Sequence, residues 1–596
     1  MKSNADTLSR TLLRLSLALI LCGLRAPAGA IDVKTTPGEG RTSSIIPMLP
    51  PSLPQGLTGG SRFQTLDVSV SAFSAPTSAV PSETAVSGPV QASVEQSLSG
   101  PLPAAQDAVP QQTAEESGVP SASASAPLST AEPLKDADVR GKTLLMVGTR
   151  GSRPFIIEEA VRVAKELGLN LVLLDKAENR KNTAGVVADN DFIAAPIDHR
   201  DDKTMKSIAD QVKAVALTRK IDYVVAFRSH HAKLVGKIVD ATGINGIPSR
   251  VTLTAEDKAR TRKALNTVPE QFVPYREVKT EAEVREFYKQ YGGTGSFKKF
   301  VMKSKLGENS RFVELDIDSE EKLVTAFTKM DVALRAEAKK KEASDTIFNR
   351  YPGIIVEQML EKAPGTVEAS VEMVVQKGQV KFAMVSDTHG IGLKGELAGG
   401  SMTFPSQMTA QVQDALIAAS AKALEIVGLR DGNARIDIMM TPDGPKVIEI
   451  NPFLGGAAIY TAVKLVSGVS LVEWGIRAML GLSLPQMPAF TTIVDYRFAA
   501  SQVSGTIDAI TGVEEAKAVP GVKHVQLLAG PGDTVAAPVE NGFEEWAEVM
   551  GTGPTYEKAR EASLLALAKI KARVIVDQVA DFLQRHLRLS PPQKPK

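Results

Sequence analysis

The sequence predicts a protein of mixed α/β and α+β class, in which several folded domains follow a long unstructured N-terminal segment. The chain has 596 residues, enough for about three or four domains at the usual size of roughly 100–200 residues. From Lys142 onward, apolar strand-like runs alternate with helical stretches, a pattern typical of a parallel α/β sheet. Within residues 433–451, two alternating runs flank a turn, which predicts an antiparallel hairpin.

Charge and cysteine content exclude several classes of function. The chain has 69 basic and 68 acidic side chains, a formal net charge of +1, so we expect no nucleic-acid partner and no polybasic membrane surface. A single cysteine excludes a disulfide framework and a cysteine-built zinc site. Six scattered histidines leave little room for a histidine-rich metal centre.

Residues 1–30 have the pattern of a secretory signal peptide. Basic residues precede the apolar run Leu15–Leu24, and Ala28-Gly29-Ala30 supplies the small residues of a cleavage site. The run is shorter than the about 20 residues of a membrane-spanning helix, so we expect no stable span; an uncleaved anchor is the main alternative. The signal would export the protein to the periplasm or the medium, and cleavage before Ile31 would remove the only cysteine, Cys22. If the signal is not used, the protein is cytoplasmic.

Residues 31–140 are expected to form a disordered linker. Pro, Ser, Ala, Thr and Gln dominate this segment, which holds 14 of the 35 prolines. Such a composition buries too little apolar surface to offset the entropy of ordering. We assign this segment no chemistry.

The folded part is expected to begin at about Lys142, with a Rossmann-like α/β domain over residues 141–250. The turn after its first strand, Gly148-Thr149-Arg150-Gly151, lacks the spacing of a dinucleotide-binding loop. Glycines in a tight strand-to-helix turn explain it equally well. The strand-like runs lie at residues 143–147, 169–174, 192–195 and 223–226.

Two lysines lie next to predicted elements further along the chain. Thr254–Asp257 has the spacing of a capping box, which predicts a helix start with Lys258 just after it. An apolar strand, FVMK, ends at Lys303, and a polar loop with Gly307 leads into a second strand. Taken alone, this is an ordinary hairpin with an exposed lysine.

The hairpin at residues 433–451 carries the most informative pattern. Its turn signal is Pro442-Asp443-Gly444, and pairing Met440 with Lys446 gives it one polar and one apolar face. In this register two carboxylates oppose each other, which destabilises a sheet unless a cation lies between them. Carboxylates beside an Asn carbonyl suit Mg²⁺ held partly by substrate phosphates, whereas a solvated sheet face is the alternative interpretation. The polar face consists of Arg435, Asp437, Glu449 and Asn451, and the apolar face of Ile436, Ile438, Ile448 and Ile450.

In this order, the parts resemble the ATP-grasp superfamily, specifically its carboxylate–amine ligases. The segment 504–522 is similar to the C-terminal domain of carnosine-synthase-like and bacterial L-amino acid (dipeptide) ligases. The resemblance implies an ATP-grasp domain over residues 251–482, with a nucleotide-binding subdomain at about 295–360, and a small C-terminal α+β domain over 483–596. Its motifs are Asp257-Lys258, FVMK, IIVEQML at 354–360, EASVE at 368–372, and ARIDIMMTPDG followed by VIEINP.

The resemblance also implies roles for individual residues. Arg435 and Asn451 would be catalytic, Arg435 by stabilising charge on the phosphoryl and tetrahedral centres. Phe453 stands where many of these ligases have an arginine, which leaves more of that role to Arg435. Lys258 and Lys303 would contact the ATP phosphates. The adenine would be bound through backbone groups of Glu357, Gln358, Met359 and Leu360, the ribose by Glu368, and Mg²⁺, or Mn²⁺ in its place, by Asp437, Glu449 and Asn451.

The implied reaction is ATP-dependent formation of an amide or peptide bond through an acylphosphate, with release of ADP and phosphate. Its substrates would be a small carboxylate and an amine, such as amino acids. Two alternatives remain: an ATP-dependent carboxylase, although the chain shows no biotin-attachment module, and a non-catalytic nucleotide-binding module. The segment His389–Pro405 would line the substrate side, and a lone loop histidine is more often a hydrogen-bonding residue than a proton carrier. Apolar stripes at 412–427 and 564–575 are interpreted as packing faces, the second of which would cover the site or form a homo-oligomer contact.

Overall fold

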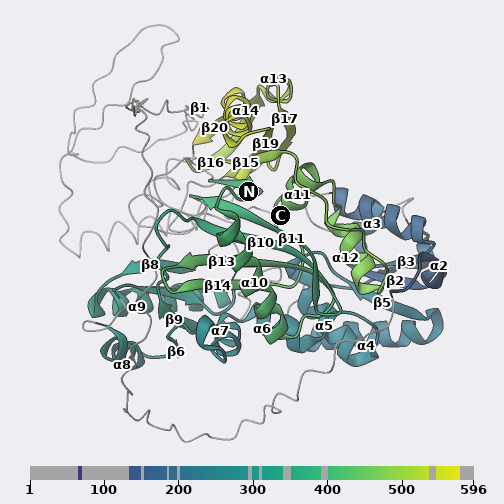
Figure 1. Ribbon diagram of the computed structural model, residues 1–596, viewed down its shortest axis with the longest axis horizontal. Coiled ribbons are helices and arrows are strands. Elements are labelled where there is room, and N and C mark those ends of the chain that lie inside the picture. Colours follow the sequence, from purple (N-terminus) through teal and green to yellow (C-terminus); the bar gives the residue numbers. More distant parts are fainter. Residues whose placement is uncertain are drawn as a thin grey trace, which may run out of the picture. The chain divides into compact units, whose positions relative to one another are not determined.

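The described residues form four β-sheets with helices packed on them, a mixed α/β architecture that confirms the expected class (Figure 1). The predicted signal peptide lies outside the described residues. In this computed structural model the described ranges are residues 65–69, 133–148, 154–183, 187–197, 202–292, 298–307, 312–339, 351–390, 400–501, 503–535 and 545–576.

The N-terminal sheet is parallel, as the alternation of elements predicts. Its strands lie in the order β4-β3-β2-β5, and every residue of β2 is buried, as expected for a strand covered on both faces. Helix α3 packs on one face, and helices α4 and α5 pack on the other. The strands are β2 (Thr143–Val147), β3 (Asn170–Asp175), β4 (Phe192–Ala194) and β5 (Ile221–Val225). The helices are α2 (Asp136–Val139), α3 (Pro154–Leu167), α4 (Asp202–Arg219) and α5 (Ser229–Thr242), with 3-10 turns at Ala177–Thr183 and Asp189–Asp191.

Lys258 begins a helix, but the predicted cap is wrong. Thr254 lies inside the preceding helix, where its hydroxyl donates to the carbonyl of Arg250 at 2.7 Å. Asp257 is the N-cap instead, because its Oδ1 accepts the N–H groups of Ala259 and Arg260 at 2.9 and 3.2 Å. The two helices are α6 (Ser249–Glu256) and α7 (Lys258–Leu265).

A small antiparallel sheet follows, with the strand order β6-β9-β7-β8. Helices α8 and α9 pack on it and bury an apolar core that includes Phe287, Phe300 and Phe327. Its elements are β6 (Tyr275–Val278), α8 (Glu281–Tyr291), β7 (Phe300–Ser304), β8 (Val313–Ile317), α9 (Glu320–Ala338) and β9 (Ile354–Gln358), with a 3-10 turn at Pro269–Gln271.

The central sheet has eight strands, in the order β14-β13-β10-β11-β12-β15-β19-β17. Helix α10 packs on one face through the apolar stripe predicted at residues 412–427, and Gly428, whose φ is +80°, is its C-cap. Helices α11 and α12 pack on the other face. The strands are β10 (Glu368–Gln376), β11 (Gln379–His389), β12 (Ser401–Phe404), β13 (Gly432–Thr441), β14 (Gly444–Asn451), β15 (Ile493–Ala500), β17 (Val522–Leu527) and β19 (Glu545–Gly553). The helices are α10 (Ala410–Val427), α11 (Ile459–Ser467) and α12 (Leu471–Met479).

The C-terminal residues contribute to two sheets. Strands β15, β19 and β17 continue the central sheet, so the boundary expected near residue 482 precedes strands of that same sheet. A separate antiparallel sheet has the order β1-β20-β16-β18. Its first strand lies inside the range predicted to be disordered, and its sequence, TLDVS, has the polar–apolar alternation of a strand. The elements are β1 (Thr65–Ser69), β16 (Gly505–Thr511), α13 (Val513–Lys517), β18 (Thr534–Val535), α14 (Tyr556–Lys569) and β20 (Lys571–Val576).

The predicted packing face at residues 564–575 is not one helix. Leu567 lies on α14, which ends at Lys569, and Ile570 is the residue between this helix and β20. Val574 and Ile575 lie on β20. The side chains of Leu567, Ile570 and Val574 nevertheless share one buried cluster.

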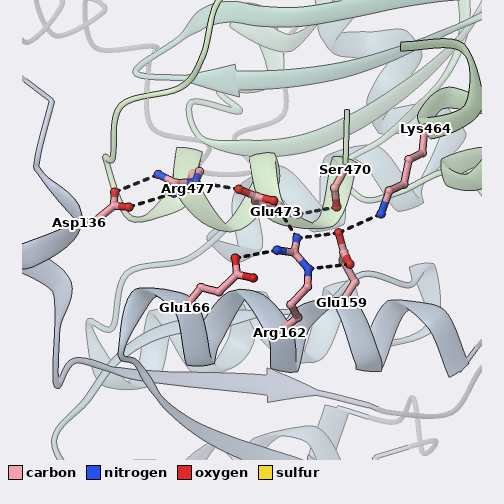
Figure 2. A network of polar contacts seen from close by, with 8 residues as sticks. All are labelled: Asp136, Glu159, Arg162, Glu166, Lys464, Ser470, Glu473 and Arg477. Atoms are coloured by element: carbon pink, nitrogen blue, oxygen red, sulfur yellow. Dashed lines mark hydrogen bonds and ion pairs between the residues drawn. The ribbon is translucent and has the colours of Figure 1, made fainter. Parts of the chain in front are cut away.

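An ion-pair network joins α3 of the N-terminal sheet to α11 and α12 of the central sheet (Figure 2). Arg162 donates to Glu159 at 2.9 Å and Glu166 at 2.6 Å on its own helix, and to Glu473 of α12 at 2.8 Å. Hydrogen bonding from Arg162, against the opposing effect of burial, lowers the pKa of Glu159 to about 2. The remaining pairs are Lys464 with Glu159 at 3.5 Å, Arg477 with Glu473 at 3.2 Å and Arg477 with Asp136 at 2.9 Å.

No single helix in the described ranges has both the length and the hydropathy of a membrane span. Helices α11 and α12 have that length and hydropathy only when the two are counted as one segment, and they are bent by 94° relative to each other.

Candidate active site

The predicted hairpin forms, with a different register from the one assumed. Lys446 pairs with Met439 rather than Met440, so the register from the turn is one residue out. A β-bulge at Ile448 adds one residue to β14, and beyond it Asp437 lies opposite Glu449, as predicted. Val447 therefore takes the fully buried position expected for Ile448, which is only half-buried.

One face of three neighbouring strands gathers the polar side chains. On β13 and β14, Arg435 pairs with Asn451 and Asp437 with Glu449, which confirms their shared face. Strand β10 lies on the other side of β13, with Ser370 opposite Asp437 and Glu372 opposite Arg435. Glu368, two residues before Ser370, begins β10 on this same face and is exposed. From here on, the polar face means the side chains of all three strands: Glu368, Ser370, Glu372, Arg435, Asp437, Glu449 and Asn451.

Arg435 is held by three acceptors on the polar face. Its Nη1 donates to Glu372 Oε1 at 2.9 Å, its Nη2 to Ser370 Oγ at 2.7 Å, and its Nε to Asp437 Oδ1 at 3.1 Å. Burial tends to lower the pKa of Arg435, but the neighbouring carboxylates raise it overall, so the group stays charged. A guanidinium fixed in this way presents a positive charge without reorganisation.

Glu372 and Ser370 were missed from the sequence. Ser370 Oγ donates to Asp437 Oδ1 at 2.7 Å, so it orients the carboxylate as well as Arg435. Glu372 is almost completely buried, and burial raises its pKa to about 7 in spite of Arg435. Their signal is the alternation of EASVE on β10, but that pattern does not show which strand β10 pairs with.

Asp437, Glu449 and Asn451 leave acceptor oxygens available for a cation. Within the described ranges, the Asn451 side chain makes no hydrogen bond, and the Glu449 carboxylate forms a hydrogen bond or ion pair only with Lys258. Nowhere in these ranges do three His, Cys, Asp or Glu side chains converge as a ready-made metal site. Two carboxylates and an amide oxygen fit Mg²⁺, which keeps several positions for water and phosphate oxygens.

Lys258 reaches the polar face from α7. Its Nζ lies 3.5 Å from Glu449 Oε1 and donates to the carbonyl of Gly307 at 3.2 Å. The helix start therefore connects β14 to the beginning of the polar loop that follows Lys303. Residues 308–311 of that loop lie outside the described residues.

Lys303 contacts Glu357, the first residue of the predicted adenine-binding segment 357–360, which we call the hinge. Glu357 is buried between Lys303 Nζ at 2.9 Å and Arg262 Nε at 3.1 Å. Burial tends to raise the pKa of Glu357, but the two cations lower it to about 2. The carboxylate thus holds Lys303 in place, and its side chain is not available to a nucleotide.

Two backbone N–H groups of the hinge form hydrogen bonds within the protein and are not free to bind adenine. The N–H of Gln358 donates to Pro274 O and that of Met359 to Lys299 O, each at 3.0 Å. The N–H of Leu360 makes no hydrogen bond within the described residues. Of the predicted adenine contacts, Leu360 is therefore the donor that the geometry leaves open.

A cavity adjoins the polar face beyond Asn451. Helix α5 of the N-terminal sheet and helix α6 form its other walls. The cavity brings the N-terminal sheet to the end of the hairpin that carries the predicted metal ligands. Its lining includes Ser229, Lys233, Thr252, Glu256, Gly307, Glu449, Asn451 and Phe453.

His389 lies on the opposite face of the sheet. Its neighbour Thr388 pairs with Glu368, so alternation turns His389 away from the polar face. Its Nε2 is 3.3 Å from Thr403 Oγ1, and burial lowers its pKa. This placement favours the hydrogen-bonding role; residues 391–399 of the same segment lie outside the described residues.

The comparisons with known proteins agree with this fold. Residues 497–574 match the family described as L-amino acid ligase C-terminal domain 2. The chain is 26% identical over 362 residues to carnosine synthase 1 of Gallus gallus, a match covering 59% of this chain and 37% of the relative. The chain spans between 37% and 58% of the length of the curated relatives it matches.

Two solved structures show the likeness of fold. An L-amino acid ligase from Bacillus licheniformis superposes with a TM-score of 0.57 at 19% identity, covering 73% of this chain and 98% of that one. The biotin carboxylase domain of 2-oxoglutarate carboxylase from Hydrogenobacter thermophilus, solved with MgADP and bicarbonate, has a TM-score of 0.52 at 18% identity. This second match covers 72% of this chain and 91% of that one.

Proposed function

We propose that this chain, a member of the ATP-grasp superfamily related to its carboxylate–amine ligases, joins a small carboxylate to an amine at the expense of ATP. Its fold is the ATP-grasp fold, and its C-terminal part matches a domain of L-amino acid ligases. The substrates we propose are amino acids, because the named relatives are an L-amino acid ligase and a carnosine synthase.

The observation that supports this proposal most directly is the composition of the polar face. It places a fixed guanidinium, Arg435, beside two opposed carboxylates and the Asn451 amide, with the Lys258 ammonium across from them. Fixed cations beside a pair of metal-binding carboxylates are what phosphoryl transfer needs, because the protein's task there is to position charge.

In the proposed reaction, a carboxylate oxygen of the first substrate attacks the γ-phosphorus of ATP, and the bond to the β-phosphate oxygen breaks. This gives an acylphosphate and ADP. The amine nitrogen then attacks the acyl carbon, loses a proton, and phosphate leaves as the amide forms. Lys258 and Lys303 bind the phosphates, while Arg435 stabilises charge on the phosphoryl group and then on the tetrahedral centre.

Asp437, Glu449 and Asn451 are the residues that would hold Mg²⁺. When bound, the ion would neutralise the phosphate oxygens and fix their orientation. Ser370 and Arg435 orient Asp437 for this role through its Oδ1. Glu449 and the Asn451 amide oxygen would supply the other protein ligands.

Two rival functions share the same nucleotide residues. A carboxylase is favoured by the likeness to the 2-oxoglutarate carboxylase domain, but that likeness is one of fold, and the C-terminal match favours the ligase. A binding module without turnover is favoured by Phe453, which occupies the place of an arginine in many ligases.

An ADP-release assay with Mg²⁺ and single or paired amino acids separates these functions. A ligase produces ADP together with a new amide, which mass spectrometry detects. A carboxylase requires bicarbonate, and a binding module binds ATP without ADP release. Glu449→Gln should abolish Mg²⁺-dependent turnover, whereas Asp443→Asn, on the exposed turn of the same hairpin, should leave it unchanged.

A further inference from the structure

The segment 452–458 connects the last predicted metal ligand, Asn451, to helix α11. It passes close to the polar face, because a Cβ placed on Gly455 would lie only 3.0 Å from Glu372 Oε1. Its other end is anchored at Ala458, the N-cap of α11, whose N–H donates to Tyr496 Oη at 2.9 Å. We call this segment the glycine loop.

The glycine loop contains a strained residue. Ala457 has a φ of +50°, in the left-handed region that residues with a Cβ rarely adopt. Such a conformation persists only where surrounding contacts impose it, and strained residues gather at functional sites. The contact that fixes the residue after Ala457 is the one with Tyr496.

Tyr496 is the inner end of a chain of polar contacts through the C-terminal strands. Its hydroxyl donates to Glu548 Oε2 on β19, and Glu548 Oε1 lies 2.8 Å from His524 Nε2 on β17. Tyr496 and Glu548 are completely buried, whereas the His524 side chain is 19% exposed. This series of contacts therefore extends from β17, at the edge of the central sheet, to the start of α11.

Burial makes this chain of contacts costly to build. A carboxylate without solvent has to be paired or hydrogen-bonded, and Glu548 has both a phenol and an imidazole as partners. Apolar residues could fill the same volume at less cost. The position of the inner end, one residue after the strained Ala457, suggests what the contacts achieve.

We propose that Tyr496 and Glu548 are positioning residues, which with His524 fix the Ala458 amide and thereby hold the glycine loop against Glu372 and Asn451. The C-terminal strands would in this way set the geometry of the site from outside it. This inference rests on the proposed ligase function for its kinetic test. The alternative is that the same contacts only satisfy buried polar atoms.

The kinetic test compares two tyrosine variants. Tyr496→Phe removes the hydroxyl that holds Ala458, and Tyr351→Phe removes a similar tyrosine–carboxylate bond, to Asp331 at 2.6 Å in the nucleotide subdomain. Tyr496→Phe should lower kcat by about ten- to a hundredfold, as expected for a small displacement of reacting groups, with the KM for ATP unchanged. Equal effects of the two variants on kcat would overturn the proposal.

Ala457→Gly separates positioning from stability. Glycine adopts a positive φ without strain, so the melting temperature should stay the same or rise. The glycine loop would, however, lose its imposed conformation, and kcat should fall. A purely structural role of the contacts gives the opposite result, an unchanged or higher kcat.

His524 offers a test by conservative replacement. His524→Gln keeps an N–H that can donate to Glu548 and should retain the activity of the original chain. His524→Leu removes it and should behave like Tyr496→Phe. If both variants retain full kcat, His524 is not part of the positioning chain.

A measurement without turnover keeps this inference distinct from the proposed function. Hydrogen exchange of residues 453–460, followed by mass spectrometry on the full chain, should be faster in Tyr496→Phe than in the original chain and unchanged in Tyr351→Phe. Should the original chain release no ADP with any amino acid, the ligase proposal fails, and the exchange rates still decide the positioning role. Equal exchange in all three proteins would refute it.

Discussion

The ammonium of Lys258 lies 3.5 Å from Glu449 Oε1, although 191 residues separate the two in sequence. Lys258 begins α7, whereas Glu449 lies on β14 just beyond its bulge. Both side chains are partly buried, with exposed fractions of 14% and 31%. The pair brings a cation from the helical segment onto the acidic part of the polar face.

Replacing Lys258 by methionine should weaken ATP binding. A charged hydrogen bond to a phosphate contributes about 1.5–3 kcal/mol, so the KM for MgATP should rise at least about tenfold. Steady-state ADP release measures this KM. Lys299→Met is the control, since Lys299 pairs with Asp316 at 2.6 Å on the surface. An unchanged KM in Lys258→Met would remove Lys258 from the phosphate site.

Glu357 should make stability depend on acid pH. Its pKa in the folded chain is about 2, below its ordinary 4.5. A carboxyl group with a lowered pKa stabilises the fold above the ordinary value, and this contribution, about 3 kcal/mol, is lost as the pH falls from 4.5 towards 2. Glu357→Gln should therefore melt at a lower temperature at pH 7.

The shape of the melting curve against pH gives the matched control for Glu357. Between pH 5 and 3 the melting temperature of Glu357→Gln should fall less steeply than that of the original chain. Glu314→Gln alters a carboxylate whose nearest cation, Lys329, is 3.9 Å away, and should follow the original chain. Parallel curves for all three proteins would show that the Glu357 carboxylate makes no pH-dependent contribution to the stability of the fold.

The ion pair of Arg162 should stabilise the packing of α3 on α12, and this stabilisation should depend on salt concentration. Its contact with Glu473 is the pair that crosses between the two helices (Figure 2). Each partly exposed pair contributes about 0–1 kcal/mol, so Arg162→Met should lower the melting temperature by a few degrees at low salt. At high salt the difference should shrink. Arg219→Met, which loses only the pair with Asp191, is the control; a salt-independent effect would contradict the electrostatic origin.

The N-terminal residues should direct export and be removed. The mature protein from the periplasm or the medium is then expected to begin at Ile31, as N-terminal sequencing would show. Leu17→Arg interrupts the apolar run and should retain the uncleaved chain in the cytoplasm. Finding intact Met1 in the cytoplasm for the unchanged sequence would end the export hypothesis.

The part of the polar face that lies on β13 and β14 could be predicted because its pattern is local. Asp437 and Glu449 lie on two strands joined by a short turn, so alternation alone places them together. The predicted pairing was nevertheless correct through two departures that offset each other: Lys446 pairs one residue away from its predicted partner, and Ile448 is bulged. A bulge depends on local twist and packing, which alternation does not encode.

Contacts made over long sequence distances could not be predicted in the same way. Glu372 reaches Arg435 across 63 residues, and Arg262 reaches Glu357 across 95. Each depends on which strand or helix lies beside which, and no local period carries that information. The same holds for β1. Its sequence alternates like that of a strand, but its pairing with β20, more than 500 residues later, could not be read from that pattern.

The bulge at Ile448 is not needed for the pairing of the hairpin, but it affects the direction in which the side chains of β14 point. If Ile448 were deleted, Val447 and Glu449 would still face Ile438 and Asp437, so every observed pair of the ladder could form. What the extra residue supplies is the local bend and twist of β14. A shortened hairpin would thus keep all the predicted metal ligands on the same face, but the orientation of Glu449 relative to Lys258 would change.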